Sequence, residues 1–380
     1  MQDQGPVIVV DGKGNSTRAA YLEDGEVKSF YLSAGVHRIG DIYKARIGSD
    51  RMRGIGWFLK LGDHETGFLP KSERLSENVP ASGNDCLVQI QKEARAGKPA
   101  QVTRQIQIVG RGLIYLPNGG YTAVSRRIDA GTRETLRRLA SDWCTGAEGV
   151  IIRTSAVKMT AARLERELKT CRDQWKKIQE CALRAAGPGR LWRQFSFIES
   201  ILNENHFPCG CTVYSNIPVD GPPLPADVRF ICRPGEALFS SWNLDAAFKE
   251  AQGARVPVRG GGYLNIEHME TLTAIDVNSG SAASGSDWEK TALKINREAA
   301  GEIARQIRLR GTGGMIVIDF IRLKNLEDRE TILDALKAAF AEDPSAIRLY
   351  GFSPMGLVEL TRKRQRTGLN RLSAGYRSGY

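Results

Sequence analysis

The sequence predicts a mixed α/β protein built from more than one domain. Its 380 residues exceed one ordinary domain, and a hydrophobic content of 41% is sufficient for several cores. Between residues 260 and 321, two apolar runs flank one amphipathic helix. Between residues 40 and 110, short β-type runs alternate with turn residues. The first pattern is typical of an α/β layer, and the second is typical of a small β-barrel.

The α/β layer is predicted by the two apolar runs Leu272–Gly280 and Gly313–Ile321. Between them, Ser286 and Glu289 have the spacing of a helix capping box, and Gly311 is a typical helix stop. A helical crossover of this length makes the two strands parallel and right-handed. The apolar face of this helix recurs at helical spacing on Trp288, Ala292, Ile295, Ala299, Ile303 and Ile307.

Each of these two strands carries an aspartate toward its carboxyl end. Asp276 and Asp319 should therefore emerge at one edge of one sheet, where open α/β sheets bind ligands. Two facing carboxylates repel unless a cation lies between them, and Mg²⁺ prefers oxygen ligands. Asn278 points to the same strand face as Asp276 and could orient its carboxylate. The alternative, that each Asp caps the loop or helix after it, remains open from spacing alone.

The charge balance points to a polyanionic partner. The formal net charge is +11 and the sequence pI is near 9.4. Basic residues concentrate at 305–310 and 362–366, and no acidic residue follows Leu360. A basic run is often only a solvated surface, but this distribution favours contact with phosphates.

The cysteines and the hydropathy pattern indicate a cytoplasmic protein. Seven cysteines without framework spacing are typical of reduced thiols. Cys209 and Cys211 form the single close pair, and the absence of a second pair or a nearby His favours a turn over a zinc site. No apolar run is long enough to span a membrane, and residues 1–5 do not resemble a signal peptide.

The two ends of the chain should share further sheet structure. Val7–Val10 and Thr17–Leu22 predict a hairpin around a turn at 11–15, and two strands need additional partners to be stable. The partners should come from much later in the chain, which makes the intervening region an insertion. The later elements expected are a helix at 196–202, strands at 211–214 and 228–232, a helix at about 327–341 and a strand at 346–351.

The inserted region begins with five short expected strands, at 41–47, 54–62, 66–70, 86–93 and 101–109. Five such strands with glycines at the corners fit an OB-type barrel, whose exposed face binds single-stranded nucleic acid. Phe58 and Phe68 are candidate stacking residues, and Lys92 and Lys98 are candidate phosphate contacts. The alternative, that one of the phenylalanines fills the barrel core, remains open.

A second candidate binding site follows the barrel. Val150–Ser155 predicts a strand that ends in a cation and a hydroxyl, before a long basic helix that begins near Thr160 and runs past Trp175. Arg153, Thr154 and the helix start offer donors that could converge on a terminal phosphate. The alternative is an ion pair between Arg153 and an acid of the helix, Glu165 or Glu167.

Several of these segments resemble the RNase E/RNase G endoribonucleases. The resemblance is carried by residues 272–279, 302–310, 314–321 and 356–362, and it continues at 67–70, 125–128 and 151–154. It therefore covers nearly the whole chain. The aspartate-bearing motifs are highly specific, whereas the barrel pattern is not.

The resemblance implies a defined subdomain order. It implies an RNase H-like subdomain in two parts, interrupted by the OB-type barrel and a 5′-sensor region, and followed by a DNase I-like catalytic subdomain. The corresponding ranges are 1–35 and 195–252 for the RNase H-like subdomain, 36–110 for the barrel, 111–194 for the sensor region, 253–367 for the catalytic subdomain and 368–380 for a basic tail.

The resemblance also implies roles for individual residues. By motif position, Asp276 and Asp319 match the Mg²⁺-binding aspartates of the family, and Asn278 matches its supporting Asn. The residues that match its contacts to a 5′-monophosphate and to RNA are Arg153, Thr154, Phe58, Phe68 and Lys98. With the resemblance, catalysis becomes the favoured interpretation of the aspartates.

Three departures from the family pattern change what we expect. Residues 370–380 contain no cysteine, so the zinc link of the family is not expected, and a homodimer would form without zinc. The long scaffolding tail of RNase E is not found, which favours the shorter RNase G-like type. Ser155–Met159 differs from the glycine-bearing loop of the family, which predicts a weakened 5′ sensor.

The function predicted from the sequence is Mg²⁺-dependent hydrolysis of single-stranded RNA in RNA processing and decay, including rRNA and mRNA. Products should carry a 5′-phosphate, and a 5′-monophosphate on the substrate should stimulate cleavage. Specificity should be loose because stacking and backbone contacts tolerate sequence, and no DNA substrate is expected. The alternative is a non-catalytic RNA-binding protein that retains the fold.

Overall fold

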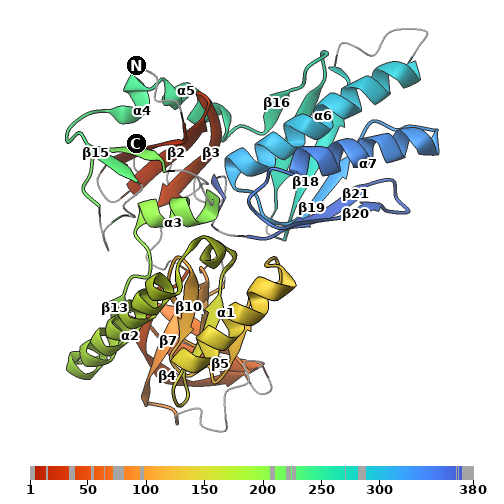
Figure 1. Ribbon diagram of the computed structural model, residues 1–380. Helices are drawn as coiled ribbons and strands as arrows, with labels where there is room; N and C mark the ends of the chain where they lie inside the picture. The colour runs from red at the N-terminus through yellow and green to blue at the C-terminus, as the bar shows by residue number, and fades with distance from the viewer. Residues whose placement is uncertain are drawn as a thin grey trace. The chain divides into compact units, whose positions relative to one another are not determined.

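In the computed structural model, the chain is a mixed α/β protein that divides into two compact units (Figure 1). Unit 1 comprises Met1–Ala34 with Phe197–Tyr380, and unit 2 comprises Gly35–Ser196. The structure describes residues 5–13, 16–33, 39–52, 55–63, 65–71, 81–94, 98–205, 210–219, 224, 228–269, 271–280, 288–364, 366 and 368–369. No described helix is both long enough and apolar enough to cross a membrane.

Unit 2 contains a closed five-stranded barrel, as the sequence predicts. Its strands follow the order β4-β5-β6-β8-β7, and β7 pairs back onto β4. The core of the barrel is built by alternate residues such as Leu59, Leu69 and Val102, which are almost fully buried. The strands are β4 (Ile42–Met52), β5 (Gly56–Lys60), β6 (Thr66–Pro70), β7 (Asp85–Lys92) and β8 (Ala100–Thr103), and β13 (Gly189–Trp192) extends the sheet beside β4.

The fifth strand of the barrel is shorter than the sequence predicts. The apolar alternation from 101 to 109 predicts one strand, but β8 ends at Thr103, whose Oγ1 accepts a hydrogen bond from the Gln105 backbone at 2.9 Å. Ile106 and Ile108 then pack in a different core of unit 2. The apolar residues between 101 and 109 therefore belong to two different cores, and the periodicity of the sequence does not show where one core ends and the next begins.

The second core of unit 2 lies between a small sheet and two helices. The sheet has the order β11-β12-β10-β9, from β9 (Ile108–Val109), β10 (Leu113–Leu116), β11 (Thr122–Val124) and β12 (Gly149–Ile152). The helical elements are α1 (Ala130–Trp143), the 3₁₀ turn η1 (Thr154–Lys158) and α2 (Ala161–Arg184). The predicted long basic helix is thus present, and Thr160 caps it by accepting a hydrogen bond from the Arg163 backbone.

The first sheet of unit 1 joins the start of the chain to a later segment. Its order is β15-β14-β1-β2-β3, so the N-terminal hairpin pairs in parallel with β14 as expected. Its strands are β1 (Val7–Lys13), β2 (Ser16–Glu23), β3 (Glu26–Ser33), β14 (Thr212–Ser215) and β15 (Arg229–Cys232). The accompanying helices are α3 (Phe197–Asn205), α4 (Leu238–Ser241) and α5 (Leu244–Glu250).

Two expectations in this region need comment. Of the turn expected at 11–15, residues 11–13 belong to β1 instead, and residues 14–15 lie outside the described residues. Of the close cysteine pair, Cys211 is buried in a core of this sheet, while Cys209 lies outside the described residues.

The second sheet of unit 1 has the order β16-β17-β18-β19-β21-β20. Its strands are β16 (Arg255–Pro257), β17 (Tyr263–His268), β18 (Leu272–Asn278), β19 (Gly314–Asp319), β20 (Ile347–Phe352) and β21 (Val358–Arg362). The predicted strand-helix-strand unit is confirmed, because β18 and β19 are parallel and α6 (Trp288–Arg310) connects them. The later strand β21, which the sequence pattern did not reveal, inserts antiparallel between β19 and β20.

The connecting helix has the predicted apolar face. Five of its six predicted positions are buried, while Trp288 remains 38% exposed at the helix start. Gly311 ends the helix with a φ of 64°, a left-handed conformation that glycine adopts readily. The predicted capping box lies partly outside the described residues, because Ser286 is not among them.

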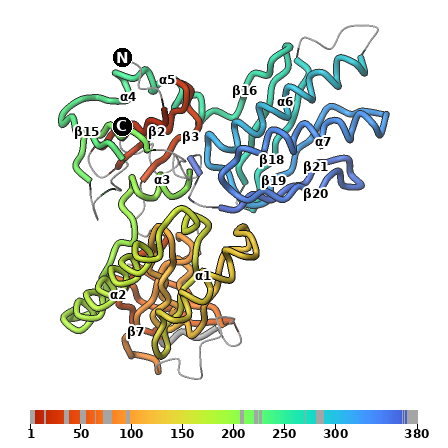
Figure 2. The backbone as a smooth tube through the Cα atoms, in the orientation of Figure 1, coloured from red at the N-terminus to blue at the C-terminus, as the bar shows by residue number. Residues whose placement is uncertain are grey.

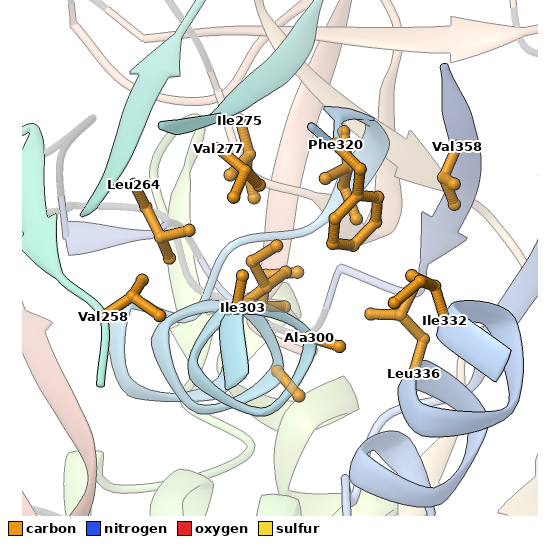
Figure 3. Close-up of a cluster of buried hydrophobic side chains, with 14 of the residues drawn as sticks. Val258, Leu264, Ile275, Val277, Ala300, Ile303, Phe320, Ile332, Leu336 and Val358 are labelled. Carbon is orange, nitrogen blue, oxygen red and sulfur yellow. The ribbon is translucent and has the colours of Figure 1, made fainter. Parts of the chain in front are cut away.

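Helices α6 and α7 (Leu326–Phe340) pack on one face of this sheet (Figures 1 and 2). Figure 3 shows the shared core, in which Leu264, Ile275, Val277 and Val358 from the strands meet Ile303 and other helix residues. Because side chains alternate along a strand, the residues between these core positions face away from the helices. We call that side of the sheet the polar face, and its members include Asn265, Asp276, Asn278, Asp319 and Glu359.

Three arginines from the basic concentrations expected to contact phosphate have internal roles instead. Arg362 is buried and forms an ion pair with Asp343 at 2.9 Å. Arg366 forms an ion pair with Glu204 at 3.2 Å, and Arg310 is 1% exposed. The expectation is therefore wrong for these arginines, because buried carboxylates and carbonyls, rather than solvent, receive their hydrogen bonds.

Candidate active site and flanking surfaces

The two predicted aspartates are direct neighbours on the polar face. Asp276 of β18 and Asp319 of β19 are cross-strand partners, and both side chains are exposed. Asn265 of β17 is the partner of Asp276 on its other side, and Arg255 of β16 is the partner of Asn265. One row across four strands therefore reads Arg255, Asn265, Asp276, Asp319. We call the two carboxylates of this row the aspartate pair.

Asn278 contacts the aspartate pair directly. Its Nδ2 donates a hydrogen bond to Oδ2 of Asp276 at 2.7 Å, which fixes one carboxylate oxygen and leaves the other for a ligand. The alternative role as a helix cap does not apply to Asp319, because α7 is capped by Asn325, whose Oδ1 accepts a hydrogen bond from the Glu327 backbone at 3.0 Å. The segment that would test the same alternative for Asp276 lies outside the described residues.

A buried amide that the sequence analysis missed anchors the chain after Asp319. Asn296 of α6 is fully buried, and its Nδ2 donates to the Ile321 carbonyl at 2.8 Å while its Oδ1 accepts from the Ile321 backbone at 3.1 Å. These two bonds hold the β19 end against the helix. The signal in the sequence was a polar residue directly after Ile295, on an otherwise apolar helix face.

The aspartate pair suits a hard divalent cation. Within the described residues, no cluster of three or more His, Cys, Asp or Glu side chains is arranged to hold a metal. Two carboxylates are nevertheless the protein contribution that Mg²⁺ commonly takes, with water and phosphate oxygens completing its octahedron. Exposure of both side chains leaves room for those further ligands. The donor set therefore fits Mg²⁺ in the presence of a phosphate ligand.

The barrel presents a second row of exposed side chains. Phe58 of β5 pairs with Phe68 of β6, Phe68 pairs with Gln101 of β8, and Gln101 pairs with Lys92 of β7. The residues that flank Phe58, Phe68 and Gln101 point into the barrel core, so these three lie on the outer surface. Lys92 is exposed at the end of β7, after a register shift. We call it the barrel row. Lys98 is exposed just before β8, and Gln101 was not anticipated from the sequence.

Neither phenylalanine fills the barrel core. Both rings are partly exposed, and their centroids lie 5.4 Å apart with the planes tilted by 55°. Gly56 makes room for this arrangement, because a Cβ there would lie 2.7 Å from Cζ of Phe68. The open question about the phenylalanines is thereby resolved in favour of the surface.

The candidate phosphate site of unit 2 lies where β12 meets η1. The Arg153 backbone donates to the Gly112 carbonyl at 2.8 Å, and its Nη1 donates to the Gly110 carbonyl at 2.7 Å. Thr154 is exposed, and its Oγ1 lies 2.9 Å from Oγ of Ser125. The Thr154 and Ser125 hydroxyls are therefore in contact at the start of a 3₁₀ turn, next in sequence to the anchored Arg153, and Ser125 is an addition to the predicted pair.

The alternative interpretation, an ion pair between Arg153 and Glu165 or Glu167, is only partly correct. Both carboxylate oxygens of Glu167 accept hydrogen bonds from the Gly112 backbone, each at 3.1 Å. Burial lowers the pKa of Arg153, and the Glu167 charge opposes this shift. Burial likewise raises the pKa of Glu167. Glu167 thus fixes the loop beneath Arg153 and contributes charge nearby, whereas Glu165 is exposed.

The family is decided by comparison with known proteins. The model of the "Ribonuclease E/G family" matches residues 107–216 and 221–365, which include the aspartate pair and Arg153. The chain belongs to the ribonuclease E/G family. The strands of the barrel precede the matched segments.

Individual relatives resemble the chain over most of its length. Ribonuclease G of Salmonella typhimurium is 27% identical over 94% of this chain and 80% of its own length. Ribonuclease G of Escherichia coli is 26% identical over 95% of this chain and 80% of its own length. Ribonuclease E of a Nostoc species is 32% identical over 95% of this chain but only 56% of its own length.

Proposed function

We propose that this protein is an endoribonuclease that cleaves single-stranded RNA with Mg²⁺ at the aspartate pair. The observation that carries the proposal is the direct pairing of Asp276 and Asp319 on the polar face, in a chain of the ribonuclease E/G family. When bound, Mg²⁺ would act as a Lewis acid on the scissile phosphate and would lower the pKa of a bound water.

The protein would contribute to this chemistry by fixing the two carboxylates in the orientation that binds the cation. The hydrogen bond from Asn278 fixes the Asp276 carboxylate, so little reorganisation is needed when the cation and substrate arrive. The two hydrogen bonds of Asn296 restrain the chain just beyond Asp319. Hydrolysis at this site would leave a 5′-phosphate on the downstream product.

The barrel row would grip the RNA without reading its sequence. Partly exposed rings such as Phe58 and Phe68 would stack on any base, and Lys92 and Lys98 would offer charge to the backbone phosphates. Loose specificity follows from this mode of contact. It suits a role in RNA processing and decay in the cytoplasm, which forms part of the proposal.

A 5′-monophosphate would be recognised at the site formed by Arg153, Thr154 and Ser125. A monophosphate offers charge and free oxygens to these donors, whereas a 5′-hydroxyl offers neither. The triphosphate is bulkier and would fit less well. RNA with a 5′-monophosphate should therefore be cleaved faster than RNA with a 5′-hydroxyl.

The finer architecture also belongs to the proposal. We assign 1–35 with 195–252 to an RNase H-like subdomain, 111–194 to the 5′-sensor region and 253–367 to a DNase I-like catalytic subdomain. A homodimer without a zinc link is proposed as the assembly. Light scattering at several protein concentrations tests that assembly.

The decisive assay uses a short single-stranded RNA with a 5′-monophosphate. With Mg²⁺, the protein should cut it internally and leave a 5′-phosphate on the downstream fragment, and chelation of the metal should stop the reaction. Asp319→Asn should be inactive under the same conditions. If the parent protein binds this RNA but never cleaves it, the non-catalytic alternative is correct.

A further inference from the structure

An arginine and a tyrosine stack beside the aspartate pair. Cζ of Arg255 lies 3.8 Å from the ring centroid of Tyr263, which is close for a cation–π contact. Arg255 begins β16 and Tyr263 begins β17, at the edge of the second sheet of unit 1. Arg255 is exposed, and Tyr263 is partly buried.

The strand alternation places this stacked pair on the polar face. Val256 and Leu264 are buried in the core shared with α6, so their neighbours Arg255 and Tyr263 face the other side of the sheet. Tyr263 is the cross-strand partner of Asn278, which holds the Asp276 carboxylate. Tyr263 therefore lies one strand from Asp276 and two from Asp319, and Arg255 lies one strand further away, which is about 5–15 Å across the sheet.

Some stacked arginines in this protein also form ion pairs with acids, whereas Arg255 forms none with the described residues. Arg18 lies over Phe239 but forms ion pairs with two aspartates, and Arg233 lies over Tyr214 but forms an ion pair with Glu236. Within the part of the chain that the structure describes, Arg255 has no acidic partner within ion-pair distance. Its cation is thus held in place by an uncharged ring and is available to an external anion.

We propose that Arg255 and Tyr263 form a nucleotide subsite for the RNA strand at the aspartate pair. This inference deepens the proposed function and depends on RNA being the substrate. Tyr263 would hold one side of the guanidinium plane, and a base would stack on its other side while an N–H group donates to a phosphate. The base concerned should belong to a nucleotide next to the scissile phosphate, because the stacked pair adjoins Asn278.

The subsite predicts a contact that requires both charge and planarity. Lysine keeps the charge of arginine but has no flat surface for a base, and glutamine loses the charge. Loss of the guanidinium should affect RNA with a base at the contacted position more than RNA that lacks that base. A general electrostatic effect of a surface cation would instead be the same for both RNAs.

The experiment measures RNA affinity in the Asp319→Asn background, where cleavage does not interfere. Arg255→Gln, Arg255→Lys and the matched control Arg297→Gln are compared by fluorescence anisotropy on a set of single-stranded RNAs. Each RNA carries one abasic nucleotide at a different position. Arg297 is exposed on α6, which packs on the opposite face of the sheet, and its substitution removes the same charge. Thermal unfolding checks that each variant is folded.

We expect Arg255→Gln to weaken binding of intact RNA about tenfold and Arg297→Gln to change it less than twofold. At one position, the abasic nucleotide should lower the RNA affinity of the Asp319→Asn protein by a similar factor. At that position it should leave the RNA affinity of the Arg255→Gln and Arg255→Lys variants almost unchanged. Such non-additivity would locate the stacked base. Equal affinities for Arg255→Gln and its background, or penalties that add at every position, would overturn the subsite.

Failure of the proposed function would look different. If the protein with Asp319 intact binds RNA without cleaving it, but the Arg255 effect persists, the subsite stands and the catalytic proposal is wrong. If cleavage occurs but Arg255→Gln behaves like Arg297→Gln, the catalytic proposal stands and the subsite is wrong.

Discussion

The polar face of unit 1 and the barrel row of unit 2 are built in the same way but carry different side chains. In each, neighbouring strands place side chains in a row across the sheet, while the alternate residues build a core. The polar face uses Asp276 and Asp319, which can hold a cation. The barrel row uses Phe58, Phe68 and a lysine, which can hold a nucleic acid chain.

The difference between the rows lies in what each can do alone. Carboxylates repel RNA phosphates in the absence of a metal, so the polar face needs help to bind its substrate. Aromatic rings and cations attract RNA but offer no group for hydrolysis. We therefore expect chemistry and affinity to be separable by mutation. The largest effects should come from the carboxylates and from the buried ion pair, and the smallest from the 5′ end.

Loss of an aspartate should stop cleavage and spare binding. Asp276→Asn or Asp319→Asn should lower the single-turnover rate by about 10³-fold or more, because the metal would lose one of its two carboxylates. RNA affinity should stay within about twofold, because it comes from distributed contacts. Glu359→Gln is the matched control, since Glu359 is an exposed acid on the same face. An Asp319→Asn protein that cleaves like the parent would refute the site.

The internal use of the basic run predicts a large loss of stability. Arg362→Ala should lower the free energy of unfolding by about 3–5 kcal/mol, because it leaves Asp343 buried without its ion-pair partner. Lys363→Ala is the control, since Lys363 is the exposed neighbour on the same strand end. Chemical denaturation measures both. Similar stability of the two variants would restore the interpretation that this run serves phosphate binding.

Removal of a barrel ring should weaken binding and leave the chemical step alone. Phe58→Ala or Phe68→Ala should cost about 1–3 kcal/mol of RNA affinity, with an unchanged rate at saturating RNA. Leu59→Ala provides the contrast, because Leu59 is in the barrel core and should lose stability instead. Unfolding of the Phe68→Ala protein with normal affinity per folded molecule would assign that ring to the core after all.

The smallest expected effect concerns the 5′ end. Arg153→Ala should remove the preference for 5′-monophosphorylated over 5′-hydroxyl RNA, which we expect to be about tenfold, and should keep the rate on the hydroxyl substrate. Competition between the two RNAs in one reaction measures the ratio. Arg163→Ala, an exposed arginine at the start of α2, is the control. Equal rates on both RNAs in the parent protein would show that this site does not sense the 5′ end.

The sequence predicted those features that depend on local periodicity. The helix between Trp288 and Gly311, the parallel pairing of its two strands and the barrel all follow from spacing and turn residues. Strand β21 was not recognised, although its residues alternate between apolar and polar and it pairs with β20, its neighbour in sequence. Its position beside β19 depends on pairing with a strand far away in sequence. The row from Arg255 to Asp319 could not be predicted either, because it depends on how four strands pair in the folded sheet.

Charge was the least reliable guide from sequence alone. A basic run looks the same whether its cations face water or a buried acid, and the Arg362 partner Asp343 could be identified only in the folded chain. For Asn296, the polar residue on an apolar helix face was visible in the sequence. Its hydrogen-bond partners on the backbone could be identified only in the folded chain.

The most direct test of the central claim is to locate the metal. Fe²⁺ in place of Mg²⁺, with ascorbate and peroxide, generates radicals that cut the polypeptide close to the bound ion. We predict cuts in the chain near Asp276 and Asp319, suppression of these cuts by excess Mg²⁺, and their loss in Asp319→Asn. Cuts confined to other segments, or an unchanged pattern in Asp319→Asn, would contradict the assignment of the metal to the aspartate pair.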